Sequence, residues 1–237
     1  MTAWPQGYAL ILHAEIDSTS NEARRLAEVG TAGPVWIMAG RQTAGYGRRG
    51  RAWHTLPGNL AATLLLRPQS PHAGQLSFAA ALAVSDMAAQ LAPDAAVTVK
   101  WPNDVLADGC KLAGILLEAG DGWLTVGIGV NLAAAPEGTE FPATALAALG
   151  IAPPPPDAAL TVIAARFARW YETWTREGFA PLRAAWLARA GGLGGPIRAR
   201  LPHEERHGLF EGIDATGALL LNEQGRTRAI AAGEVFF

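Results

Sequence analysis

The sequence predicts an α+β protein in two parts, a β-sheet flanked by helices over residues 1–193 and a small antiparallel β-barrel over residues 194–237. Two observations support this fold class. In the first part, apolar runs of strand length alternate with amphipathic stretches of helix length. The pattern changes at "GGLGGP", residues 191–196, after which short alternating runs are interrupted by the turn-forming stretches "DATG" and "NEQG".

The first helix is expected in "DSTSNEARRLAEVG", with hydroxyl caps at Ser18–Ser20 and Gly30 as its end. A long helix should follow Asp157, a good N-cap, after the stiff connector of four prolines at 153–156. The other expected elements are buried strands at 34–40 and 59–67, a core helix at 75–92, strands at 96–102, 111–120 and 122–132, and a short helix at 180–192. A turn at 107–109 should join the strands at 96–102 and 111–120.

Composition narrows the class of protein. The chain has 237 residues, 50% of them hydrophobic, which is enough for a packed core. Acidic residues outnumber basic ones by 21 to 19, so no global positive field draws the chain to nucleic acid. Cys110 is the single cysteine, which excludes an internal disulfide, and no apolar run is long enough for a membrane span. The sequence therefore predicts a cytoplasmic protein with no membrane segment.

Lysine is rare in this chain. Of its 19 basic residues only two are lysines, Lys100 and Lys111, and both lie in "KWPNDVLADGCK". An ammonium is a compact point charge that a planar guanidinium does not replace. The pair therefore indicates a site that requires lysine.

The stretch "GYGRRG", residues 45–50, matches the spacing of a dinucleotide-binding turn. Such a turn must open a helix and be followed by an acid about 20 residues later. Here "RAWHTLPGN" follows, whose Pro57 and Gly58 oppose a helix, and "LLLRPQ" offers no acid. The Rossmann interpretation therefore fails.

The same stretch suits a loop that grips phosphate. Its glycines allow close backbone approach, and guanidinium groups bind oxyanions in pairs of hydrogen bonds. Trp53 offers an aromatic face for a base, and Asp104 in "KWPND" offers a carboxylate for a Mg²⁺-bound triphosphate. A solvated basic turn is the simpler alternative.

Taken together, "DSTS", "GRQTAGYGRRGRAW", "PGNL", "KWPND", "KLAGILLE", "VGIGVNL" and "PATAL" resemble the biotin protein ligases, also called biotin–[acetyl-CoA-carboxylase] ligases. The resemblance implies a mixed sheet flanked by helices, like that of class II aminoacyl-tRNA synthetases, and an SH3-like C-terminal domain. It implies that ATP and biotin form biotinyl-5′-AMP with Mg²⁺, and that the biotinyl group passes to a lysine of a biotin carboxyl carrier domain. It is compatible with a homodimer. The expected form is monofunctional and does not bind DNA, because about fifteen residues before "DSTS" leave no room for a helix-turn-helix domain.

The resemblance also implies roles for individual residues. Lys111 and Arg48 are the expected catalytic residues, and Asp104 the expected metal ligand. Expected biotin-binding residues are Ser18, Thr19, Ser20, Gln42, Gly45, Tyr46, Gly47, Arg48, Lys111 and Gly114. Expected ATP-binding residues are Arg48, Arg51, Trp53, Lys100, Asn103 and Asn131.

Two positions depart from the family pattern. Tyr46 stands where the usual "GRGRRGR" has arginine, and Ser20 replaces the asparagine of "STN". Activity is still expected, with altered ligand affinity. The alternatives are a lipoate or octanoate ligase or transferase of the same superfamily, and a nucleic-acid-binding module that uses "GRRGRAW". The acidic net charge and the lack of a second basic patch count against the module.

Overall fold

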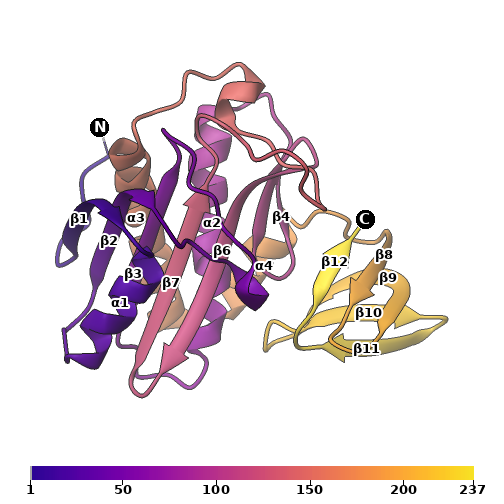
Figure 1. Cartoon of the computed structure of the whole chain (residues 1–237). Coiled ribbons are helices and arrows are strands. Elements are labelled where there is room, and N and C mark those ends of the chain that lie inside the picture. The colour runs from indigo at the N-terminus through magenta and orange to yellow at the C-terminus, as the bar shows by residue number, and fades with distance from the viewer. Residues whose placement is uncertain (1) are drawn as a thin grey trace.

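The computed structural model describes residues 2–237 and contains two sheets. Figure 1 shows the larger sheet with helices on both sides, and the C-terminal strands as a separate lobe beside it. The seven strands of the larger sheet follow the order β1-β2-β3-β7-β6-β5-β4. They are β1 (Ala9–Ile16), β2 (Val35–Gln42), β3 (Leu60–Leu66), β4 (Val97–Lys100), β5 (Asp104–Ala107), β6 (Cys110–Gly120) and β7 (Trp123–Val130). β1 and β2 are parallel and the other pairs antiparallel, so the predicted mixed sheet is confirmed.

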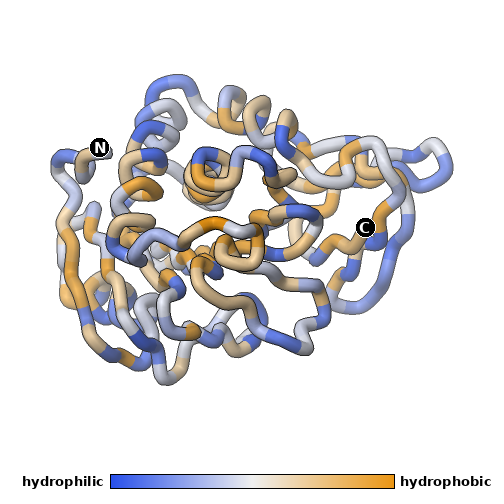
Figure 2. The backbone as a smooth tube through the Cα atoms, turned by 90° about the horizontal axis from the view of Figure 1, so that it is seen from above, coloured by the Kyte–Doolittle hydropathy of each residue, from blue (hydrophilic) through white to orange (hydrophobic). Residues whose placement is uncertain are grey.

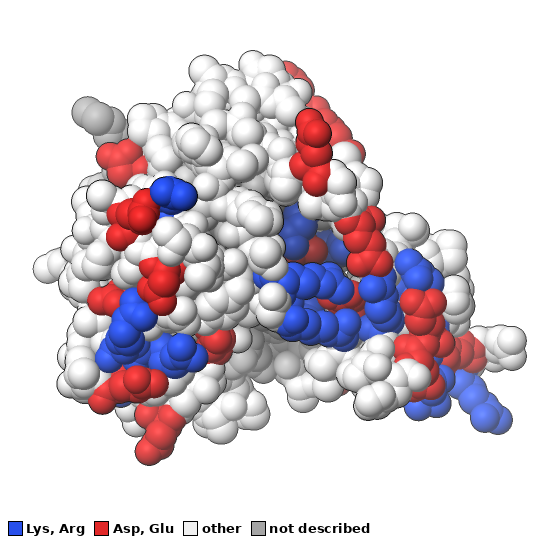
Figure 3. Space-filling view, in the orientation of Figure 1, with Lys and Arg blue, Asp and Glu red and all other residues white. Residues whose placement is uncertain are grey.

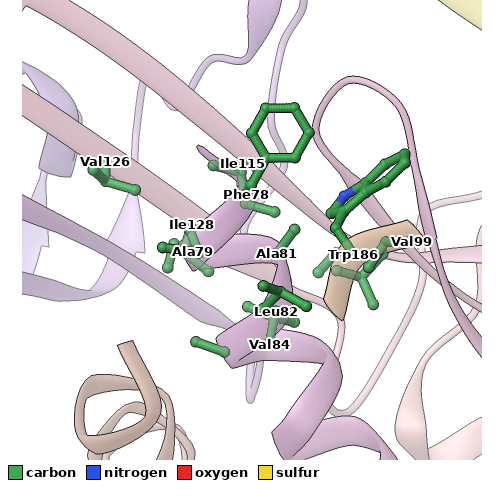
Figure 4. Close-up of a cluster of buried hydrophobic side chains, with 14 of the residues drawn as sticks. Phe78, Ala79, Ala81, Leu82, Val84, Val99, Ile115, Val126, Ile128 and Trp186 are labelled. Carbon is green, nitrogen blue, oxygen red and sulfur yellow. The ribbon is translucent and has the colours of Figure 1, made fainter. Parts of the chain in front are cut away.

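Successive side chains of each strand point to opposite faces of the sheet, so the sheet separates two apolar layers. Val35 and Ile37 of β2 pack with helix α1 (Thr19–Glu28), whereas Trp36 belongs to the larger core on the other face. That core is formed with α2 (Leu76–Leu91), α3 (Pro156–Glu177) and α4 (Ala180–Leu187). Figure 4 shows Phe78 of α2 beside Trp186 of α4, and their rings meet edge to face at 5.5 Å. Among residues 2–237, α1 is thus the one helix that packs on this face of the sheet.

The second sheet contains β8 (Pro196–Arg200), β9 (Glu205–Ile213), β10 (Leu219–Glu223), β11 (Arg226–Ile230) and β12 (Glu234–Phe236). Its order is β11-β10-β9-β8-β12, with every pair antiparallel. Among residues 2–237 the pairing does not close, so the expected barrel is an open five-stranded sheet. Three short 3₁₀ helices, η1 (Arg48–Gly50), η2 (Ala73–Gln75) and η3 (Leu146–Leu149), complete the elements.

Three expectations about elements need correction. β1 was not expected, and the segment taken as one strand with its turn contains two strands, β4 and β5. The turn at 107–109 therefore joins β5 to β6, where Asp108 and Gly109 have φ of 48° and 77°. Asp157 does not cap α3, because the helix begins one residue earlier at Pro156. Proline fits the first helical turn, since its missing N–H has no partner there anyway.

Polarity follows the same layering. Figure 2 shows hydrophobic stretches through the middle of the body and hydrophilic stretches at its edges. Within residues 2–237, none of the helices combines the length and the hydropathy that crossing a bilayer requires.

Candidate active site

A cavity of about 340 Å³ lies on the face of the sheet that carries α1. Its floor is formed by β3, β6 and β7. Its walls include the start of α1, the end of β2, the segments 46–54, 100–104 and 136–143, and β12, the edge strand of the C-terminal sheet. Figure 3 shows basic side chains gathered in the hollow between the main body and the C-terminal lobe. A volume of this size suits a small molecule.

One part of the cavity is lined by neutral polar groups. Gln42 accepts hydrogen bonds through Oε1 from the backbone N–H and the hydroxyl of Thr19, at 2.8 and 3.1 Å. Thr63 donates to the Thr19 hydroxyl at 2.9 Å and lies 3.2 Å from the Ser20 hydroxyl. These side chains orient one another and offer donors and acceptors without net charge.

Ser18 is placed differently from what the resemblance implies. It is 1% exposed and does not line the cavity, because its hydroxyl caps α1 by accepting from the backbone N–H of Ser20 and Asn21. Its position is structural: it fixes where the helix starts and so where Thr19 and Ser20 point. Gly45 is also outside the lining, and a Cβ there would lie 2.6 Å from the Trp53 carbonyl oxygen and 2.7 Å from Gln42 Nε2.

The segment 45–53 forms a small hairpin over the cavity. Tyr46 and Ala52 form an antiparallel bridge, Gly47 N–H donates to the Arg51 carbonyl at 2.7 Å, and Trp53 N–H donates to the Gly45 carbonyl at 2.9 Å. Arg49 at its tip has φ of 58°, a left-handed conformation that turns the chain. Tyr46, Gly47, Arg48 and Arg51 line the cavity, as expected for a loop that covers a ligand.

The two lysines meet at one carboxylate. Lys111 Nζ lies 2.6 Å from Asp104 Oδ1, and Lys100 Nζ lies 3.6 Å from Asp104 Oδ2. Lys100 is 5% exposed and lies over the ring of Phe141, and its burial lowers the pKa of its ammonium, against the opposing effect of Asp104. Lys111 is more accessible, with 28% of its side chain exposed, and both lysines line the cavity.

The indole of Trp53 packs against two glycines of the sheet, Gly114 and Gly129. Gly114 and Gly129 are paired on β6 and β7, and a Cβ on Gly129 would lie 2.3 Å from the indole of Trp53. A Cβ on Gly114 would lie 3.3 Å from the same ring and 3.2 Å from Lys111 Nζ. The glycine pair therefore makes room for a flat ring beside the lysine.

The two expected asparagines are already bonded to the protein. Asn103 accepts from Arg48 Nη1 at 3.2 Å and donates to the Ile115 carbonyl. Asn131 is 2% exposed and donates to the carbonyl of Thr144 at 3.1 Å. Both line the cavity and hold its walls, and their expected contacts with ATP stay predictions.

The C-terminal sheet contributes Gly233 and Glu234 to the site, two residues to which the sequence assigned no role. Arg48 donates to the carbonyl of Gly233 at 2.9 Å, and Arg51 forms two close contacts with the Glu234 carboxylate, at 2.9 and 3.0 Å. Glu234 is also 3.6 Å from Arg49. The only available signal was "GEV" in the tail, which carried no assigned role.

The donor set does not fit a metal centre built by the protein. Among residues 2–237 no group of three His, Cys, Asp or Glu side chains converges to hold an ion, and Asp104 already faces two ammonium groups. Mg²⁺ commonly keeps waters and substrate phosphates as ligands. Ligation by Asp104 stays a prediction.

The two sheets and the cavity between them have known counterparts. Residues 14–132 match the biotin/lipoate A/B protein ligase family, and residues 192–237 match the biotin protein ligase C-terminal domain. The chain belongs to the biotin/lipoate A/B protein ligase family.

Similarity to particular members is closer still. The chain is 48% identical to a biotin–[acetyl-CoA-carboxylase] ligase of Paracoccus denitrificans, over 94% of this chain and 98% of that protein. It is 38% identical to the Mycobacterium tuberculosis protein of the same name, over 85% and 78%. The structure of the Aquifex aeolicus biotin protein ligase in complex with biotin and ATP superposes with a TM-score of 0.85 at 28% identity, covering 96% and 97% of the chains.

Proposed function

We propose that the chain is an ATP-dependent biotin–protein ligase. It forms biotinyl-5′-AMP and pyrophosphate from biotin and ATP, and then transfers the biotinyl group to a lysine of a biotin carboxyl carrier domain. The observation that carries this proposal is the 48% identity with a biotin–[acetyl-CoA-carboxylase] ligase over nearly the whole of both chains. It favours biotin over lipoate or octanoate, which the family name alone leaves open.

The cavity suits biotin because its two parts differ in charge. Biotin has a neutral polar ring system, an apolar chain and a terminal carboxylate. Thr19, Ser20 and Gln42 provide neutral donors and acceptors for the ring, whereas Lys111 provides a cation for the carboxylate. Trp53 offers a face for adenine, and Arg48 and Arg51 bind the phosphates.

The first step joins two anions. The biotin carboxylate attacks the α-phosphorus of ATP, a P–O bond forms, and the bond to pyrophosphate breaks. At about 3 Å and an effective dielectric near 20, the repulsion is roughly 5 kcal/mol. Lys111 and Arg48 offset it by placing positive charge beside the reacting oxygens. In the second step the acceptor amine attacks the carbonyl carbon, AMP leaves, and no covalent enzyme intermediate forms.

The remaining assignments belong to the same proposal. The catalytic unit comprises residues 1–193 and the C-terminal unit residues 194–237. Six further residues contact biotin or ATP, namely Tyr46, Gly47, Gly114, Lys100, Asn103 and Asn131. The enzyme acts in the cytoplasm, does not bind DNA, and is compatible with a homodimer.

The test mixes purified protein with ATP, Mg²⁺ and either biotin or lipoate, and follows pyrophosphate release. Biotin-dependent release, followed by labelling of a biotin carboxyl carrier domain but not of the same domain lacking its acceptor lysine, is the expected result. Release with lipoate alone would reject the proposal.

A further inference from the structure

Tyr46 departs from the arginine of the family pattern, and its side chain leads away from the arginines of its own hairpin. Its hydroxyl lies 2.9 and 3.1 Å from the carboxylate oxygens of Glu118 on β6, and 3.2 Å from Oδ1 of Asn21 on α1. The single phenol proton is donated to the closer and charged acceptor, Glu118, so the hydroxyl connects the base of the hairpin to β6, with Asn21 of α1 beside it.

The chemistry of this contact favours a permanent donor. Partial burial and the negative charge of Glu118 raise the pKa of Tyr46 to about 12, so the phenol keeps its proton at neutral pH. The charge of Arg24 lowers the pKa of the phenol and the charge of Asp17 raises it. A hydrogen bond to a charged acceptor is stronger than one between neutral groups.

The contacts between the tip of the hairpin and the C-terminal sheet differ from this one. At its tip, Arg48 and Arg51 contact Gly233 and Glu234, and these cations must release their protein partners to bind phosphate. The hydrogen bond between the Tyr46 hydroxyl and Glu118 need not break when ligand binds, because Glu118 does not line the cavity. The Tyr46–Glu118 contact can therefore persist while the tip exchanges partners.

We propose that Tyr46 is a positioning residue that keeps the hairpin 45–53 closed over the cavity through its hydroxyl contact with Glu118. Its ring lines the cavity, so closure brings a wall of the ligand site into place. The identity of the retained ligand, biotin or its adenylate, rests on the proposed function. The closure itself does not.

The experiment measures opening of the hairpin directly. Trypsin cleaves after arginine, and Arg48, Arg49 and Arg51 lie within the hairpin. Cleavage there is followed in ligand-free wild-type protein, in Tyr46→Phe, in Glu118→Ala, in the double variant and in Glu118→Gln, which keeps an acceptor. Tyr8→Phe is the matched control, because Tyr8 packs on the opposite face of the sheet.

We expect Tyr46→Phe to raise hairpin cleavage about tenfold, which corresponds to about 1.4 kcal/mol. Glu118→Ala should have the same effect, the double variant should add little, and Glu118→Gln should restore much of the protection. Wild-type cleavage in Tyr46→Phe, or effects of the two changes that simply multiply, would overturn the proposal.

A second measurement separates this proposal from the function. Release of preformed, radiolabelled biotinyl-5′-AMP should quicken in Tyr46→Phe by a similar factor, whereas Tyr8→Phe should match the wild type. If wild-type protein forms no adenylate, the proposed function fails, and the trypsin result still decides the role of Tyr46. Faster cleavage with unchanged adenylate release would overturn the part of the proposal that concerns ligand retention.

Discussion

Replacing Gly129 by alanine tests whether the contact between Trp53 and the sheet matters for ATP. The new Cβ would lie 2.3 Å from two carbon atoms of the indole, whereas carbon atoms pack at about 3.5–4.0 Å. Gly129 lies within a central strand, so its backbone resists movement, and the indole must retreat by more than about 1 Å. A misplacement of this size costs on the order of 100-fold in rate where positioning matters.

We therefore expect Gly129→Ala to lower kcat/KM for ATP about 100-fold, with little change in biotin affinity. The assay is pyrophosphate release at varied ATP and saturating biotin, with biotin affinity measured by calorimetry. The melting temperature should fall only modestly, because Gly129 does not have a positive φ and the displaced Trp53 indole is only half-buried.

Gly74→Ala is the matched control, since a Cβ there meets nothing within 4 Å. It should retain wild-type kinetics. A Gly129→Ala enzyme with a kcat/KM for ATP within twofold of wild type and an intact fold would refute the placement of Trp53 in the ATP site.

Four further outcomes follow from the site. Lys111→Ala should abolish adenylation while circular dichroism stays native, because a partly exposed side chain is removed, and near-normal pyrophosphate release would contradict its role. Glu234→Gln should lower the free energy of unfolding in urea by less than about 1 kcal/mol, because its partner Arg51 is half-exposed. Deletion of residues 196–237 should impair ATP use and biotin transfer more than biotin binding. Between pH 10 and 12 stability should fall as pH rises, because the Tyr46 phenol holds its proton to about 12 only when folded, and Tyr46→Phe should lessen that fall in pH-dependent melting.

Local chemistry predicted most elements of the fold. The hydroxyl cap and closing glycine of α1, and the apolar runs of β2, β3, β6 and β7, are signals carried by neighbouring residues. β1 was not predicted because it is an edge strand. Its Leu10 and Leu12 are exposed, so it lacks the alternation of buried apolar and exposed polar residues that marks a strand. β5 was not predicted because its four residues, which lie between two turns, are too few to show a strand periodicity.

The site was less predictable, because it depends on contacts between distant segments. The hydrogen bond from Arg48 to Gly233 joins residues 185 positions apart, and nothing near either residue signals the other. Ser18 shows the converse problem. A serine before a helix suits both a cap and a ligand contact, and only its burial distinguishes the two.

Charge balance links the site to the composition of the chain. In the ligand-free protein each cation of the site faces a carboxylate: Asp104 lies beside buried Lys100 and partly exposed Lys111, and Glu234 lies beside half-exposed Arg51. Under the proposed function, substrate carboxylate and phosphates exchange with these carboxylates, so each cation passes from one anion to another and is never left unpaired. A chain with a net charge of -2 can therefore hold a concentrated cationic site, because acids from β5 and β12 keep its cations in place until substrate arrives.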